Sequence, residues 1–204
     1  MQHKILILFA HPLFEKSAAN KVLTNYIPGS PDITFHDLYE AYPEFNIDVE
    51  REKALLEQHD LVIWHHPIYW YSCPPLLKQW IDLVLEFGWA YGPGGTAIAG
   101  KKLMQVVTTG GGRAAYQHEG FHQRTLLDFL APMIQTARLC KMDYLPPFVV
   151  HGTHRVSEAE MHHFGKAYEA LLRALLQPGF DFEALRKHDY ANDWLDKLNP
   201  QQHG

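Results

Sequence analysis

Short apolar runs alternate with longer stretches of helical periodicity along most of the chain. This pattern predicts strands over residues 4–10, 33–39, 60–65, 102–110 and 147–152, and helices over residues 17–26, 50–58, 75–86, 123–140 and 157–176. The first, third and fourth apolar runs are nearly continuous, which is typical of strands buried on both faces of a parallel sheet. Asp48 and Ser157 are candidate N-caps, the latter within the capping-box pattern SEAE. The alternation predicts an α/β doubly wound domain with right-handed crossovers.

The pattern changes after residue 176. Pro178 and Gly179 are followed by a short amphipathic stretch that contains Trp194, and then by a polar end. We therefore divide the chain into a domain over residues 1–176 and a C-terminal arm over residues 177–204. The arm either packs on its own domain or is frayed, or else it clasps a partner subunit. An exposed Trp194 would suit a docking role.

Composition and charge exclude several classes of protein. The chain has 204 residues, of which 47% are hydrophobic and 20% charged, as in an ordinary globular protein with a full core. The net charge of −5 and the absence of a long basic run argue against a nucleic-acid partner. No apolar run approaches the roughly 20 residues of a membrane span, and the N-terminal run is too short for a signal peptide. With only two cysteines, these features favour a cytoplasmic protein.

In open α/β sheets, ligands bind beyond the carboxyl ends of the strands, where the strand order switches. After the first strand, the segment AHPLFEKSAANK lacks a dinucleotide or P-loop fingerprint. Its residues 17–20 open a helix whose first N–H groups suit a phosphate, with the Ser17 hydroxyl and the Asn20 amide as further donors and His11 nearby. The alternative is an ordinary helix cap.

The loops after the third and fourth strands have complementary character. Prolines stiffen HPIYWYSCPP, and its aromatic rings suit a flat ligand, although they would also serve as core filler. Three consecutive glycines in TTGGG let the backbone approach a ligand closely. Together the three loops describe a pocket for a phosphate joined to a planar heterocycle, which fits a flavin nucleotide.

The segments LFAHP with SAAN, HPIYWYSCPPLLKQWID, GWAYGPGGTAIAGK and VVTTGGG resemble the flavodoxin-like NAD(P)H:quinone reductase family, over roughly residues 4–176. The resemblance is strongest to the branch of ancillary subunits of glutathione-regulated potassium-efflux systems. It implies a five-stranded parallel sheet of order 2-1-3-4-5 with helices on both faces. It also implies a homodimer with a flavin in each site.

Matching the family's motifs assigns roles to residues of this sequence. The flavin phosphate would be held by His11, Ser17, Ala18, Ala19 and Asn20. The flavin ring would be lined by Pro67, Ile68, Tyr69, Trp70 and Tyr71, and its polar edge bonded by Thr108, Thr109, Gly110 and Gly111. Tyr116 and His122 match a catalytic tyrosine and histidine beside the flavin, where they would donate hydrogen bonds or protons. The alternative for this pair is two polar residues on an exposed loop.

Other candidate chemistry is weaker. His118 with His122, and His162 with His163, do not supply the three or four converging ligands of a zinc site, so we expect no metal. Cys73 is expected to be a small buried hydrophobe.

We therefore expect a flavin-dependent NAD(P)H:quinone oxidoreductase that transfers two electrons through FMN, with FAD as the alternative cofactor. Arg113 and Lys101 are the candidates to meet the 2′-phosphate of NADPH. The alternative function, which can coexist, is a regulatory subunit of a potassium-efflux antiporter, peripheral to the inner membrane.

Overall fold

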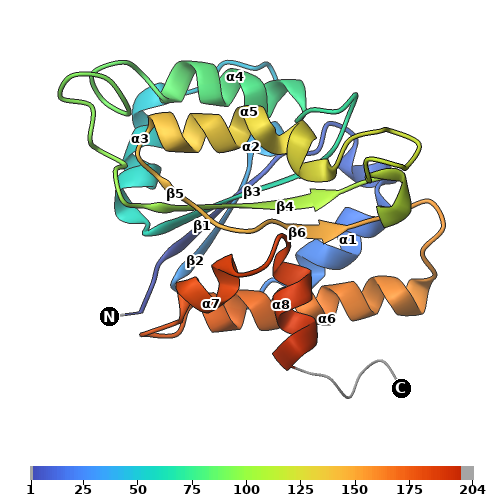
Figure 1. Cartoon of the computed structure of the whole chain (residues 1–204). Coiled ribbons are helices and arrows are strands. Elements are labelled where there is room, and N and C mark those ends of the chain that lie inside the picture. Colours follow the sequence, from blue (N-terminus) through green and yellow to red (C-terminus); the bar gives the residue numbers. More distant parts are fainter. Residues whose placement is uncertain (1, 199–204) are drawn as a thin grey trace.

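The computed structural model describes residues 2–198, which form a parallel sheet between two layers of helices (Figure 1). The strands are β1 (Ile5–Phe9), β2 (Ile33–Asp37), β3 (Leu61–Pro67), β4 (Lys102–Thr108), β5 (Asp143–Tyr144) and β6 (Phe148–Val150). All of their ladders are parallel, and their order is β2-β1-β3-β4-β5, with β6 also paired to β4. This confirms the doubly wound fold and the strand order that the sequence resemblance implied.

The fifth position of the sheet differs from the predicted single strand over residues 147–152. Two short segments, β5 and β6, occupy it, and Pro146 and Pro147 lie between them. A proline has no N–H group to donate to a ladder, so the pair interrupts the pairing with β4. The sequence pattern identified the second segment and missed the first.

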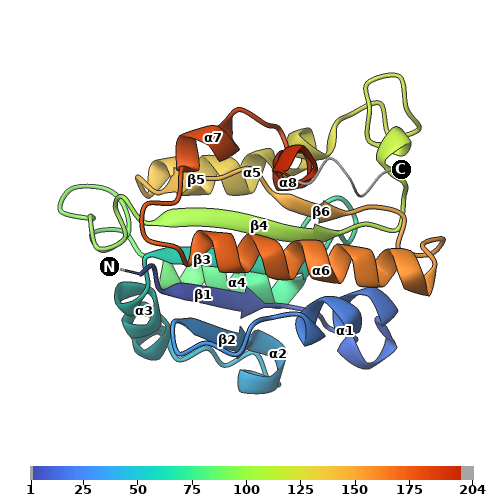
Figure 2. The ribbon, with the colours of Figure 1, turned by 90° about the horizontal axis from the view of Figure 1, so that it is seen from below.

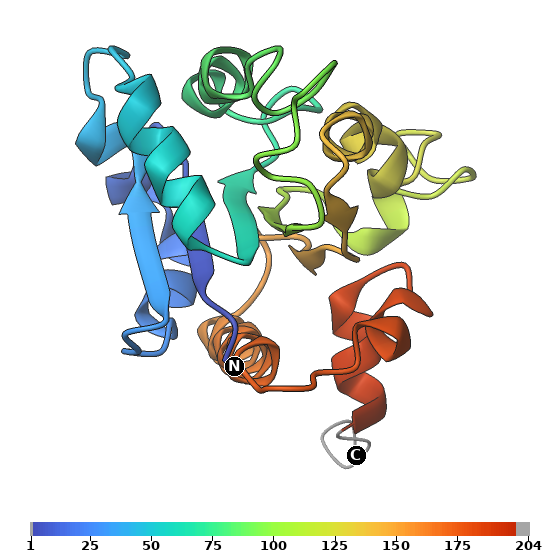
Figure 3. The same cartoon turned by 90° about the vertical axis from the view of Figure 1, so that its left-hand side faces the viewer.

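Helices cover both faces of the sheet, as the end-on view shows (Figure 3). The first core cluster packs α2 (Leu38–Ala41), α3 (Val49–Gln58), α4 (Pro75–Val84) and α5 (Leu126–Leu139) on one face. The second packs α1 (Ala18–Asn25), α6 (Glu158–Leu175), α7 (Phe182–Arg186) and α8 (Ala191–Leu198) on the other. Burial of these apolar faces at roughly 25 cal/mol per Å² is the main force that holds the layers together.

Side-chain caps fix where several of these helices begin. Asp48 caps α3, and Ser157 forms a reciprocal capping box with Glu160 at the start of α6, as predicted. Asp37 also caps a helix, because its carboxylate accepts hydrogen bonds from the N–H groups of the next turn. The strand predicted over residues 33–39 therefore ends at Asp37, where α2 takes over.

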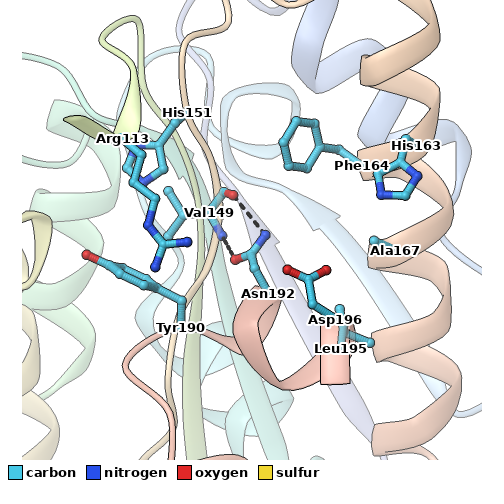
Figure 4. Close-up of a pocket in the computed structure, with 10 residues that line it drawn as sticks. All are labelled: Arg113, Val149, His151, His163, Phe164, Ala167, Tyr190, Asn192, Leu195 and Asp196. Atoms are coloured by element: carbon cyan, nitrogen blue, oxygen red, sulfur yellow. Dashed lines mark hydrogen bonds between the residues drawn. The ribbon is translucent and has the colours of Figure 1, made fainter. Parts of the chain in front are cut away.

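The C-terminal arm packs on its own domain. Its helices α7 and α8 lie beside α6 and the β5–β6 edge (Figure 2). Trp194 is only 9% exposed and is part of the second core cluster, so the expectation of an exposed docking tryptophan is wrong. The Asn192 amide bonds both the N–H (2.8 Å) and the C=O (3.0 Å) of Val149, which covers the free edge of β6 (Figure 4).

Candidate functional site

The start of α1 lies at the carboxyl edge of the sheet, a few residues after β1 ends. Ser17 is its N-cap, and Ser17 Oγ accepts a hydrogen bond from the backbone N–H of Asn20 (3.1 Å). The N–H groups of Ala18 and Ala19 belong to the first turn, where no acceptor exists within a helix. They carry the partial positive charge of the helix end. The segment is thus an ordinary cap that also presents donors to an anion.

The buried Asn20 side chain ties α1 to two strands of the sheet. Its Nδ2 donates to Ser17 Oγ (2.9 Å) and to Thr108 Oγ1 (3.2 Å), while its Oδ1 accepts from His65 Nε2 (3.1 Å). Both N–H bonds of the amide are therefore used inside the protein. This corrects the expectation that the Asn20 amide donates directly to a phosphate. Asn20 instead positions the hydroxyls of Ser17 and Thr108.

Two histidines near this helix end are neutral. Burial, with smaller contributions from His66 and His11, lowers the pKa of His65 to about 3. Burial also lowers the pKa of His11, although a backbone hydrogen bond opposes the shift. His11 Nδ1 accepts from the N–H of Leu13 (3.2 Å), so the proton of the neutral ring is on Nε2. His11 therefore offers one N–H donor without a positive charge.

The aromatic loop after β3 folds into a tight turn. Tyr69 and Ser72 exchange two backbone hydrogen bonds of 2.9 and 3.0 Å. The two central residues, Trp70 and Tyr71, have positive φ angles of 48° and 65°, a backbone region that bulky side chains rarely adopt. Tyr71 stacks on Phe129, whereas Trp70 is 93% exposed. The turn thus holds the Tyr71 ring against the protein and leaves the Trp70 ring in solvent.

The loop after β4 approaches the candidate catalytic pair closely. A Cβ atom on Gly111 would lie 3.2 Å from the ring of Tyr116 and 3.6 Å from His122 Nε2, so the glycine permits this approach. The rings of Tyr116 and His122 are 4.5 Å apart. Burial raises the pKa of Tyr116, and an interaction with the Thr109 side chain partly offsets the effect. The phenol is therefore protonated at neutral pH and available as a donor.

These three loops line one cavity of about 520 Å³, within the range of roughly 300–1,000 Å³ typical of ligand pockets. The predicted residues that line it are His11, Ser17, Ala19, Asn20, Pro67, Ile68, Tyr69, Thr108, Gly110, Gly111, Tyr116 and His122. The other predicted residues, Ala18, Trp70, Tyr71 and Thr109, lie next to lining residues without lining the cavity themselves. The structure thus brings the three separate segments together.

Sequence reasoning missed four lining residues: Ala115, Phe121, Thr153 and His154. The last two follow β6, and backbone hydrogen bonds tie their loop to the loop after β4, including Thr153 N–H to Thr109 O (3.0 Å). Thr153 and His154 could have been predicted from their position, because the loop after the fifth strand also lies at the carboxyl edge of the sheet.

Both candidates for a 2′-phosphate are engaged elsewhere. The Arg113 guanidinium forms two hydrogen bonds with Asp193 (2.8 and 3.0 Å) and lies over the Tyr190 ring. Lys101 Nζ donates to the carbonyls of Glu57 and His59. Lys101 precedes β4 and so lies at the opposite edge of the sheet from the cavity.

A second cavity, of about 270 Å³, lies between the arm, α6 and β6 (Figure 4). Arg113 and Asn192 line it and are bonded within the protein, to Asp193 and to Val149 respectively. His151 also lines it and lies 3.1 Å from the Thr109 hydroxyl. These three polar side chains thus stabilise the arm and the loop after β4.

Three further observations bear on the candidate chemistry. Cys73 is buried, and burial raises the pKa of its thiol, which confirms the small-hydrophobe interpretation. Within residues 2–198, no three histidine, cysteine or acidic side chains converge as metal ligands would. In the same part of the chain, no helix has the length and apolar character to cross a bilayer.

The chain is similar to a known family and to several named proteins. A family described as having the flavodoxin-like fold matches residues 3–175. The glutathione-regulated potassium-efflux system ancillary protein KefG of Cronobacter sakazakii is 44% identical over 176 residues, which cover 86% of this chain and 96% of that protein. The KefG protein of Escherichia coli K12 is 42% identical over the same share of each chain.

Two solved structures are similar in both sequence and shape. General stress protein 14 of Treponema denticola, crystallised in complex with FMN, is 41% identical with a TM-score of 0.79. The match covers 84% of this chain and 99% of that one. An NADPH-quinone reductase of P. pentosaceus is 32% identical with a TM-score of 0.76, over 83% of this chain and 97% of that one.

Proposed function

Because the chain belongs to the flavodoxin-like family, together with the ancillary proteins of glutathione-regulated potassium-efflux systems, we propose that it is an FMN-dependent NAD(P)H:quinone oxidoreductase. The observation that carries the proposal is the single cavity in which Asn20, Ile68 and Gly111 meet from three separate loops. The FMN seen with the Treponema denticola protein supports FMN over FAD.

The donor set at the α1 end fits a phosphate. The backbone N–H groups of Ala18 and Ala19, the hydroxyl of Ser17 and the Nε2–H of His11 would all donate to phosphate oxygens. The Thr108 hydroxyl, expected from the sequence at the edge of the ring, is linked to Ser17 through Asn20 and would join this donor set. None of these groups carries a full charge, so binding would depend on oriented dipoles. The loop from Pro67 to Tyr69 and the loop at Gly110 and Gly111 would then enclose the ring system.

FMN, when bound, supplies the centre that accepts and donates hydride. The chain's own residues contribute position and protons. Tyr116, protonated and at the cavity wall, would donate a hydrogen bond or a proton to an oxygen of the reduced acceptor. His122, whose ring lies 4.5 Å away, would share this role from the same loop. NAD(P)H and the quinone would use the same opening in turn.

Exposed apolar side chains beside the cavity support a homodimer. Phe121 lines the cavity and is 86% exposed, and Trp70 projects from the neighbouring turn. Large exposed aromatic side chains are typical of surfaces that another protein covers. A second copy of the chain would bury both rings and complete the wall of the site.

The decisive test uses the purified protein with FMN, NAD(P)H and a simple quinone. We expect FMN fluorescence to be quenched on binding, and NAD(P)H to be oxidised in a 1:1 ratio with hydroquinone formed. The Tyr116→Phe variant should still bind FMN but turn over about 10²-fold more slowly, because it loses a proton donor.

The matched control is Tyr26→Phe, whose hydroxyl bonds His162 outside the cavity, and it should behave as wild type. A protein that binds neither FMN nor FAD and shows no turnover would refute the proposal. Tighter binding of FAD than of FMN would correct the cofactor.

A second function, regulation of a potassium-efflux antiporter, is favoured by the 44% identity to the KefG ancillary protein. Such a partner would hold the protein at the cytoplasmic face of the inner membrane. In cells with the antiporter, we expect deletion of this chain to slow potassium efflux, and the wild-type gene to restore it. Unchanged efflux, with no co-purification of the two proteins, would exclude this function.

A further inference from the structure

His65 is a buried histidine that no catalytic assignment uses, yet it contacts the phosphate end of the cavity through Asn20. It lies on β3, is fully buried, and its Nε2 is 3.1 Å from Asn20 Oδ1. Phe9 and Tyr168 contact the imidazole edge to face, at 5.1 and 5.5 Å between ring centroids. These two rings hold the imidazole in one orientation.

The hydrogen-bond geometry defines which nitrogen of His65 carries the proton. Nε2 faces a carbonyl-type oxygen that can only accept, whereas Nδ1 has no hydrogen-bond partner among residues 2–198. A proton on Nδ1 would leave that N–H as a buried donor without an acceptor. It would also place the lone pair of Nε2 against a lone pair of Asn20 Oδ1, which is repulsive. The neutral ring with its proton on Nε2 is therefore the stable form.

The direction of the hydrogen bond between His65 and Asn20 determines the direction of the bonds from Asn20 to Ser17 and to Thr108. When His65 donates to Asn20 Oδ1, the Asn20 amide nitrogen must face Ser17 and Thr108 and donate to both hydroxyls. Each hydroxyl then accepts from Asn20 and keeps its own proton to donate into the cavity. If the amide were reversed, Asn20 Oδ1 would face the two hydroxyls. Ser17 or Thr108 would then donate its hydrogen bond to Asn20 and present only a lone pair to the ligand.

We propose that His65 is a positioning residue that makes the cavity select phosphorylated flavins, because it fixes the Asn20 amide so that Ser17 and Thr108 act as donors. The inference deepens the proposed function and rests on it. A phosphate accepts hydrogen bonds at every oxygen, so it requires such donors, whereas the ribityl hydroxyl of riboflavin both donates and accepts. His65 thus acts on the phosphate without touching it.

The test compares the dissociation constants of FMN and riboflavin, measured by flavin fluorescence quenching. For wild type we expect FMN to bind far more tightly than riboflavin. His65→Leu should weaken FMN binding on the order of 10- to 100-fold, as for loss of a hydrogen bond to a charged group, and change riboflavin binding by less than about 3-fold. His65→Gln retains an N–H donor and should recover most of the FMN affinity.

His66→Leu is the matched control, because His66 is the next residue of β3, is equally buried and bonds Gln105 rather than Asn20. It should leave the ratio of the two dissociation constants unchanged. Equal losses of FMN and riboflavin affinity in His65→Leu would show a merely structural role and overturn the inference. Wild-type protein that binds neither flavin would instead refute the proposed function.

Imidazole ¹⁵N chemical shifts of the wild-type protein without ligand give a readout that needs no variant. We expect His65 to be neutral and protonated at Nε2 at pH 7. Protonation at Nδ1, or at both nitrogens, would overturn the inference even if the His65 variants fail to fold.

Discussion

Replacing Asn20 with aspartate is expected to raise the dissociation constant of FMN by about 10³-fold. The carboxylate keeps the size of the amide and can still accept from His65, but it cannot donate to Ser17 and Thr108. It also places a negative charge in the wall of a cavity proposed to hold a phosphate. Unfavourable like-charge contacts cost several kcal/mol at an interface, and about 1.4 kcal/mol corresponds to a factor of ten.

The measurement is a titration of FMN against the purified variant, with the unfolding midpoint recorded in parallel. Asn25→Asp is the matched control, because Asn25 is an exposed residue at the other end of α1. That control should bind FMN as wild type does. An Asn20→Asp variant that is folded and binds FMN within about threefold of wild type would show that the phosphate lies elsewhere.

Local pattern was sufficient to predict the central strands of the sheet and the three loops that line one cavity. Continuous apolar runs identified β1, β3 and β4, and the rule that ligands bind beyond carboxyl strand ends selected the loops that meet in the cavity. The same rule applies to the loop after β6. Its Thr153 and His154 were missed because only three loops were considered.

The details that depend on long-range contacts could not be read from local pattern. The role of Asn20 is determined by Thr108 and His65, which lie far away in the sequence. The burial of Trp194 depends on the face that α6 offers it, which an amphipathic pattern in the arm does not reveal. Likewise, the sequence showed that the aromatic loop was stiff, but not that its turn would direct Trp70 outward.

Glu52 is the clearest residue whose role depends on long-range contacts, and its substitution should have the largest effect on stability. In sequence it is one of several charged residues of α3, yet it is fully buried. Its carboxylate accepts hydrogen bonds from His36 Nε2 (2.8 Å), Tyr42 Oη (2.5 Å) and Trp80 Nε1 (2.7 Å). A buried carboxylate is tolerated only when its oxygens are satisfied in this way.

Glu52→Gln is expected to lower the free energy of unfolding by about 3–5 kcal/mol, as for other broken buried networks. The substituted amide would point an N–H group at one of three donors, which leaves buried groups unpaired. Urea unfolding measures the change. Glu50→Gln, in the same helix but exposed, is the matched control and should change stability by less than about 0.5 kcal/mol.

The two variants should also differ in acid. Burial by itself would raise the pKa of Glu52, but the hydrogen bonds from His36, Tyr42 and Trp80 outweigh it and hold the pKa below its usual value. The unfolded chain therefore binds a proton at a higher pH than the folded chain, and stability falls as pH drops from the unfolded value toward the folded one. On acidification, wild type and Glu50→Gln should lose the stability that the ionised Glu52 carboxylate contributes. Glu52→Gln lacks this carboxylate and should not show that loss. Parallel losses in all three proteins would show that Glu52 is not the carboxylate that links folding to pH.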